Sequence, residues 1–98
     1  IFLNMATRVN ASHILVRTEE QAKQVLEQIN NGKNFETLAK EVSICPSRKK
    51  GGSLGWFSHG QMVKEFQKVA FKMKKGQISQ PVKTQFGWHI IKANDTKG

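Results

Sequence analysis

The sequence lacks several features that would place it in a common class of protein. It contains a single cysteine, Cys45, which excludes an internal disulfide and fits a reducing compartment. No apolar run approaches the roughly 18 residues that a membrane-spanning helix needs. The motifs GxGxxG, GxxxxGKS/T, HExxH and CxxC are absent, so nucleotide and zinc sites are not indicated. We therefore expect a protein that works without a metal or other cofactor.

Acidic residues are also scarce. The 98 residues include 16 Lys+Arg but only 7 Asp+Glu, which gives a formal net charge of +9. A chain of this length forms one small domain with a single modest core. Its positive field favours anionic partners, either nucleic acid or an acidic lipid surface, although a solvated surface is the simpler interpretation.

Four short runs have the composition of strands. They are rich in apolar and β-branched residues and lie at 11–16, 54–58, 77–83 and 87–91. Together with three intervening helices they give the order β-α-α-β-α-β-β. This order is typical of an α+β domain with one antiparallel or mixed sheet packed by helices.

The three predicted helices have recognisable starts and stops. Thr18 and Gln21 fit a capping box at the start of the first helix, which ends at Asn31-Gly32. Residues 34–42 form the second helix, begun by an asparagine cap. The third is expected over 63–72, where apolar residues recur at helical spacing.

Two of the predicted strands each carry one histidine, His13 and His89. If these strands are neighbours, both imidazoles can lie on the same face of the sheet and meet. A strand histidine is nevertheless more often a core residue than a reactive one. The set of His13, Cys45, His59 and His89 matches no common zinc spacing. A cysteine hydrolase is also conceivable, but no orienting acid or oxyanion loop is evident.

Five segments of the chain closely resemble the parvulin-type peptidyl-prolyl cis/trans isomerases, in order and over about residues 10–93. They are Ser12-His13-Ile14-Leu15-Val16, Ser43-Ile44-Cys45-Pro46-Ser47, Gly51-Gly52-Ser53-Leu54-Gly55-Trp56-Phe57, Gly60-Gln61-Met62-Val63-Lys64-Glu65-Phe66 and Gln85-Phe86-Gly87-Trp88-His89-Ile90-Ile91. The resemblance implies a four-stranded antiparallel sheet surrounded by helices, of the FKBP-like superfold. It also implies a short, single-domain microbial parvulin that accelerates rotation about Xaa-Pro bonds without covalent chemistry.

The same resemblance implies an active site. A hydrogen-bonded pair of His13 and His89 would lie beside Cys45, with Thr84 close by. The residues expected to bind substrate are Leu54, Phe57, Gln61, Met62 and Phe66, together with Arg17.

One departure from the family bears on substrate choice. Phosphate-directed parvulins carry an arginine pair in a long loop after the first histidine strand. Here Arg17 is followed directly by Thr18-Glu19-Glu20, and a lone arginine is a poor phosphate clamp. We therefore expect that phosphorylation of the substrate is not required.

The resemblance also sets the expected organisation of the chain. Residues 1–8 would be an N-terminal extension or a remnant of cloning, with Met5 as the natural start. Residues 9–94 would form the isomerase domain, and 95–98 a C-terminal tail. We expect a cytoplasmic monomer that acts on proline-containing peptide segments and client proteins. The alternatives are a chaperone-like peptide binder with weak catalysis and a basic module that binds nucleic acid.

The positive charge has an expected location on the third helix. At 100° per residue, Lys64, Lys68, Lys72 and Lys75 would form one narrow stripe opposite the apolar face, although Phe71 interrupts the pattern. Such a stripe would hold the protein loosely and reversibly at an anionic surface, such as nucleic acid or the inner face of the membrane.

Overall fold

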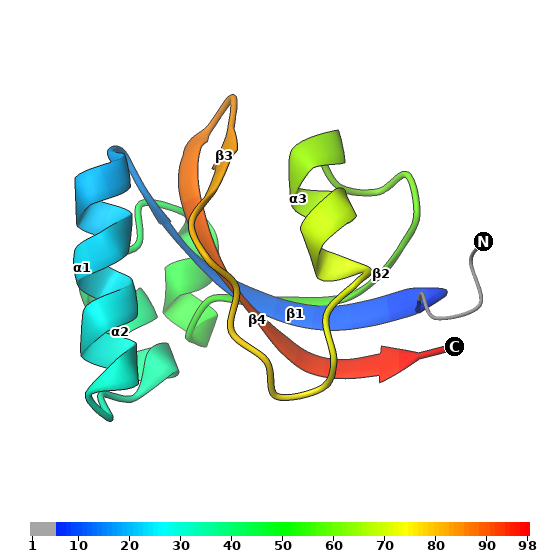
Figure 1. Ribbon diagram of the computed structural model, residues 1–98, viewed down its shortest axis with the longest axis horizontal. Helices are drawn as coiled ribbons and strands as arrows, with labels where there is room; N and C mark the ends of the chain where they lie inside the picture. Colours follow the sequence, from blue (N-terminus) through cyan, green and yellow to red (C-terminus); the bar gives the residue numbers. More distant parts are fainter. Residues whose placement is uncertain (1–5) are drawn as a thin grey trace.

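A computed structural model of the protein describes residues 6–98 and contains one four-stranded sheet with helices on both faces (Figure 1). The expected start at Met5 lies outside the described residues. The elements follow one another in the order β1 (Arg8–Val16), α1 (Glu19–Asn30), α2 (Phe35–Val42), a 3₁₀ helix η1 (Pro46–Lys50), β2 (Ser53–Ser58), α3 (Lys64–Ala70), β3 (Val82–Thr84) and β4 (Gly87–Lys97).

The sheet has the strand order β2-β1-β4-β3, and each neighbouring pair is antiparallel. The first and last strands are therefore its two central strands. Their register places Leu15 opposite His89 and His13 opposite Ile91. The predicted α+β fold with a four-stranded antiparallel sheet is confirmed.

Each face of the sheet buries a separate apolar cluster. Helix α3 covers one face, where its Phe66 and Ala70 pack with Val9, Phe57 and other residues of β1, β2 and β4. Helices α1 and α2 cover one end of the opposite face (Figure 1), and Leu38 packs there with residues such as Ile14 and Ile90. The strands alternate between the two clusters because successive side chains of a strand point to opposite faces.

The first two helices begin as the sequence predicts. The Thr18 hydroxyl accepts a hydrogen bond from the Gln21 backbone N–H, and the Gln21 side chain accepts one from the Thr18 backbone N–H. This reciprocal pair is the capping box. In α2, Asn34 Oδ1 accepts from the Thr37 N–H at 2.9 Å.

The third helix is shorter than predicted. It occupies only Lys64–Ala70, whereas the prediction extended it to residue 72. Turns and irregular backbone follow it up to Gly76. The physical reason is Phe71, which is 1% exposed and packs edge-on against Phe57. Burying Phe71 and then Met73 in the same cluster requires the chain to leave the helical path.

The strand bounds also differ from the prediction. The strand expected at 77–83 is limited to β3, preceded by an isolated bridge from Ile78 to Lys92. Residues 95–97, expected to belong to a tail, continue β4 because they pair with residues 8–10 of β1. Arg8, expected in the N-terminal extension, pairs with Lys97. Backbone pairing thus extends the domain at both ends.

Two adjacent glycines return the chain from η1 to the sheet. Gly51 and Gly52 both have positive φ, at 66° and 89°. The Gly52 carbonyl accepts a hydrogen bond from the His13 N–H at 2.9 Å. This hydrogen bond fixes the backbone of β1 at His13, which the sequence analysis predicts to be catalytic. A Cβ at Gly52 would overlap the His13 carbonyl oxygen.

We expect Gly52→Ala to destabilise the protein far more than Gly76→Ala. Both positions have a φ near +90°, which costs any L-residue about 1–2 kcal/mol, but only Gly52 meets backbone atoms, and such crowding adds roughly 1–3 kcal/mol. Urea unfolding of the two variants measures the difference. Equal losses of unfolding free energy would show that the close approach is unimportant.

Candidate functional site

A cavity of about 590 Å³ opens between α3, the loop after α2 and the β3–β4 turn. Its base is formed by side chains of the two central strands. Seven of the residues predicted for the site line it: His13, Cys45, Leu54, Gln61, Met62, Phe66 and His89. Five further lining residues were not predicted: Leu15, Ile44, Pro46, Val63 and Phe86.

The two histidines meet at the base of this cavity, as the strand pattern predicted. Their Nδ1 atoms are 2.9 Å apart, and the rings stack with an interplanar angle of 23°. Phe66 from α3 packs edge-on against both rings, with centroid distances of 5.8 Å to His13 and 5.3 Å to His89. One aromatic side chain thus holds the pair against the sheet.

Thr84 extends the hydrogen-bonded chain to the β3–β4 turn. Its Oγ1 lies 2.7 Å from Nε2 of His89 and accepts a hydrogen bond from the Phe86 N–H at 3.1 Å. Thr84 is therefore a buried positioning residue that does not line the cavity. The same contacts hold the turn that carries Phe86 at the mouth of the cavity.

Burial keeps both imidazoles neutral at physiological pH. Desolvation lowers the pKa of His13 to about 4, with a further contribution from His89, and desolvation also lowers the pKa of His89 to about 4. A neutral ring has one N–H, so one Nδ1 donates to the other across the 2.9 Å contact. Nε2 of His13 is buried and has no partner among residues 6–98.

The cavity wall is apolar and carries no charged side chain. Leu54, Met62, Val63 and Phe66 supply much of this wall. Arg17, predicted to bind substrate, lines a neighbouring groove and not this cavity.

Phe57 is the clearest error in the predicted site. It is 2% exposed and lies behind Phe66 at a centroid distance of 6.0 Å, in the core cluster under α3. Alternation along β2 places Phe57 on the buried face but cannot distinguish a cavity wall from the core behind it.

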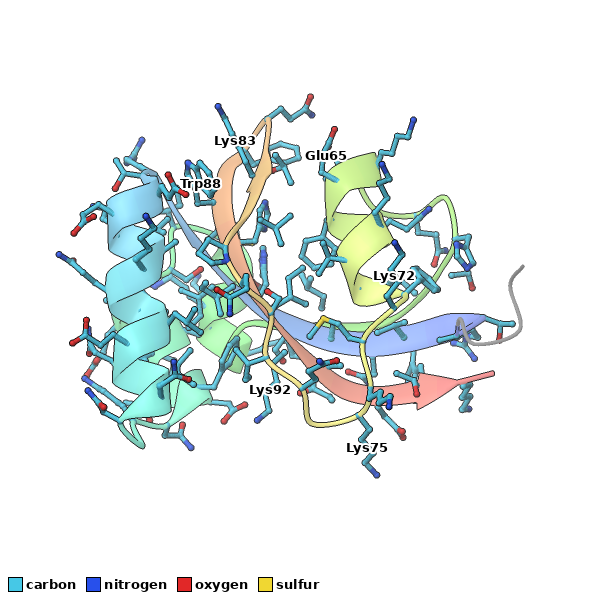
Figure 2. All side chains as sticks on the ribbon, viewed as in Figure 1. Glu65, Lys72, Lys75, Lys83, Trp88 and Lys92 are labelled. Atoms are coloured by element: carbon cyan, nitrogen blue, oxygen red, sulfur yellow. The ribbon has the colours of Figure 1, made fainter. Side chains whose placement is uncertain are left out.

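The predicted lysine stripe is not continuous. Lys64 and Lys68 lie on α3, but Lys72 and Lys75 follow its end. Figure 2 shows Lys72 beside the end of α3, whereas Lys75 extends from the following loop, away from the helix. The early end of the helix at Phe71 is the reason. Binding of Lys64 and Lys68 to an anionic surface stays a prediction.

The remaining histidine has a structural position. The His59 ring stacks on Phe71 with the centroids 3.7 Å apart, and its Nε2 is 3.3 Å from the Ala6 carbonyl oxygen. Within the part of the chain that the structure describes, no group of three or more His, Cys, Asp or Glu could hold a metal ion. Among residues 6–98, no helix has the length and apolar character needed to cross a membrane.

The fold and the site together are those of the parvulin family. Residues 2–95 match the family described as "Rotamase: PPIC-type PPIASE domain". The chain belongs to this family, as the sequence motifs predicted.

Named relatives support the assignment. The chain is 53% identical to foldase protein PrsA 1 of Bacillus cereus over 95 residues, which cover 96% of this chain and 33% of that protein. It is similar to the crystal structure of PrsA from Bacillus subtilis, with a TM-score of 0.90, 49% identity, and coverage of 94% of this chain and 36% of that one. The solution structure of NmPin, the parvulin of Nitrosopumilus maritimus, matches with a TM-score of 0.80 and 45% identity over 90% of this chain and 96% of that one. The chain thus spans about a third of the curated PrsA relatives it matches.

Acidification should destabilise the protein through the histidine pair. Each ring has a folded-state pKa of about 4 against 6.5 in a model peptide, so the unfolded chain binds more protons between these values. The contribution of the neutral histidines to the unfolding free energy is therefore fully present above pH 6.5. It is lost as the pH is lowered to about 4, by on the order of 3 kcal/mol per histidine. Urea unfolding at pH 4.5 and 7.5 measures this loss.

The matched control for this prediction is the His13→Gln, His89→Gln variant. It keeps the carboxylates of the chain but lacks the two buried rings, so its stability should change less between the two pH values. Parallel pH profiles for the variant and the wild type would contradict the assignment.

Proposed function

We propose that this domain accelerates rotation about Xaa-Pro bonds in peptides and unfolded client proteins, by a non-covalent mechanism that does not require phosphate. The observation that carries the proposal is an apolar, uncharged cavity of about 590 Å³ whose base is a pair of neutral histidines. This volume lies within the range of about 300–1,000 Å³ that is common for ligand sites.

The reaction itself explains the need for an apolar cavity. An Xaa-Pro amide rotates over a barrier of roughly 18–20 kcal/mol because twisting breaks the amide resonance. The twisted amide is less polar than the planar one. A cavity lined by Leu54, Met62 and Phe66 therefore penalises the planar ground state more than the twisted transition state.

Within this mechanism the histidine pair provides a neutral base for the cavity, with both rings held in one orientation. Because both rings are neutral, they add no net charge beneath the reacting amide. The hydrogen bonds from Thr84 through His89 to His13 hold the rings in one orientation. The base of the cavity is thus preorganised before substrate enters.

Cys45 contributes polarity near the substrate and does not act as a nucleophile. A catalytic thiol is commonly activated by a base within hydrogen-bonding distance. Neither Nε2 of His13 nor the other ring nitrogens of the pair are hydrogen-bonded to Cys45. The thiol lies at the cavity wall, where it can interact with the substrate without forming a bond to it.

The enzyme function predicts different effects of two methionine substitutions. Met62→Ala removes apolar wall, so kcat/KM for a short Leu-Pro peptide should fall by roughly tenfold, equivalent to about 1.4 kcal/mol. Met73→Ala is the matched control because Met73 is buried in the core and does not line the cavity. NMR exchange spectroscopy at a temperature where both variants are folded measures the rates. If the wild type leaves the exchange rate unchanged, the proposed function is wrong.

The absence of charge from the cavity wall has a consequence for substrate choice. A phosphate next to proline would lose hydration without gaining a cationic partner in the cavity. Arg17, in the adjoining groove, is a single guanidinium without a second cation in that lining.

We expect a Leu-Pro peptide to be isomerised at least as efficiently as the matching phosphoserine-Pro peptide. The comparison is of kcat/KM for the two peptides at the same ionic strength, with a Glu-Pro peptide as control for negative charge. A preference of about 100-fold for phosphoserine, equivalent to about 2.7 kcal/mol, would contradict the proposal.

A further inference from the structure

The exposed large apolar side chains are not scattered over the surface. Within residues 6–98 they are Val42, Ile44 and Phe86, with exposed fractions of 40%, 44% and 57%. Phe86 and Ile44 both line the catalytic cavity. Val42 and Ile44 both line a second, smaller groove. The three exposed side chains therefore lie along the cavity and the groove, which adjoin at Ile44.

The second groove has a volume of about 240 Å³ and adjoins the cavity at Ile44. Its position follows from the backbone, because the Ile44 N–H donates to the Leu15 carbonyl at 2.8 Å and so holds this segment against the end of β1. Helix α1 begins just beyond, after Arg17 and Thr18. The lining residues are Val16, Arg17, Gln21, Gln24, Val25, Gln28, Val42 and Ile44.

The groove combines an apolar floor with a row of amides. Gln21, Gln24 and Gln28 follow one another at i, i+3 and i+7 on a single face of α1, and all three are exposed. Each amide can donate and accept hydrogen bonds. The Gln21 oxygen is occupied by the backbone N–H groups of residues 17 and 18. In a chain with a net charge of +9, this lining contains one cation and no carboxylate.

Such a lining suits an extended polypeptide backbone. Backbone N–H and C=O groups need partners of both kinds, and glutamine amides supply both without selecting a side-chain charge. From Gln21 to Gln28 the helix rises by about 10 Å, the length of about three residues of extended chain. Because the groove adjoins the cavity at Ile44, a polypeptide bound in the cavity can reach it, which argues that the occupant is the same molecule.

We propose that the groove between α1 and the 42–44 segment is a second subsite, which binds about three residues of the client polypeptide flanking the isomerised proline, largely independently of their sequence. This inference rests on the proposed isomerase function. It makes the domain a better enzyme for unfolded chains than for isolated Xaa-Pro dipeptide units, because each added backbone contact lowers KM.

The test compares a four-residue Leu-Pro peptide with two longer ones. Four uncharged Ala and Ser residues are added before the core peptide in one and after it in the other. The groove adjoins the cavity at a single residue, Ile44, so one of the two extensions should raise kcat/KM by about tenfold and the other should not. Equal kcat/KM for all three peptides would overturn the proposal.

Matched variants show which residues cause the rise in kcat/KM with peptide length. In the double variant Gln24→Ala, Gln28→Ala, the ratio of kcat/KM for the long peptide to kcat/KM for the short one should fall close to one. Val42→Gln should also lower this ratio, because it makes the exposed floor of the groove polar. The control is Asn30→Ala, Gln80→Ala, which removes two neutral amides from a separate groove on another side of α1. The assignment would be contradicted if the control lowered the kcat/KM ratio as much as the groove variants do, or if the groove variants left the ratio unchanged.

A binding measurement separates this inference from the proposed function. In nitrogen-15 NMR spectra, the side-chain amides of Gln24 and Gln28 should shift with the long peptide but not with the short one. Shifts without turnover would support the groove and contradict the isomerase proposal. Turnover of short peptides with neither shifts nor a length effect would support the isomerase and overturn the groove.

Discussion

The antiparallel pairing of β1 with β4 is the interaction on which the rest of this structure depends. It joins the two ends of the described chain at the centre of the sheet and brings together two histidines 76 residues apart in sequence. Because Leu15 lies opposite His89 and His13 opposite Ile91, both imidazoles point to the same face. A shift of one residue in this register would separate the rings and invert both apolar faces.

The histidine pair places a stability cost at the functional site. Two rings that would be partly protonated in water are buried as neutral groups, and their pKa values fall to about 4. Phe66 and Thr84 make this possible, since one excludes water from the rings and the other forms a hydrogen bond with Nε2 of His89. The same burial that weakens the protein in acid gives the cavity a base without net charge.

Charge is distributed so that the path expected for the substrate remains nearly uncharged. The chain has a net charge of +9, yet the catalytic cavity has no charged lining residue and the adjoining groove has only Arg17. The lysines of α3 and the cations of η1 are exposed elsewhere. Under the proposed function this separation suits clients of varied sequence, because a buried or half-buried charge would reject many of them.

Much of this protein was predictable from sequence because the information is local. Apolar, β-branched composition predicted the histidine strands, capping residues marked the starts of α1 and α2, and the ordered motifs identified the family and most of the cavity wall. Tertiary packing decided the rest. Phe71 ended α3 early and separated Lys75 from Lys64, Phe57 went to the core behind Phe66, and Ile44 and Phe86 remained exposed beside the cavity. Periodicity determines the face on which a side chain lies, but only the neighbouring elements determine whether that face meets core, cavity or solvent.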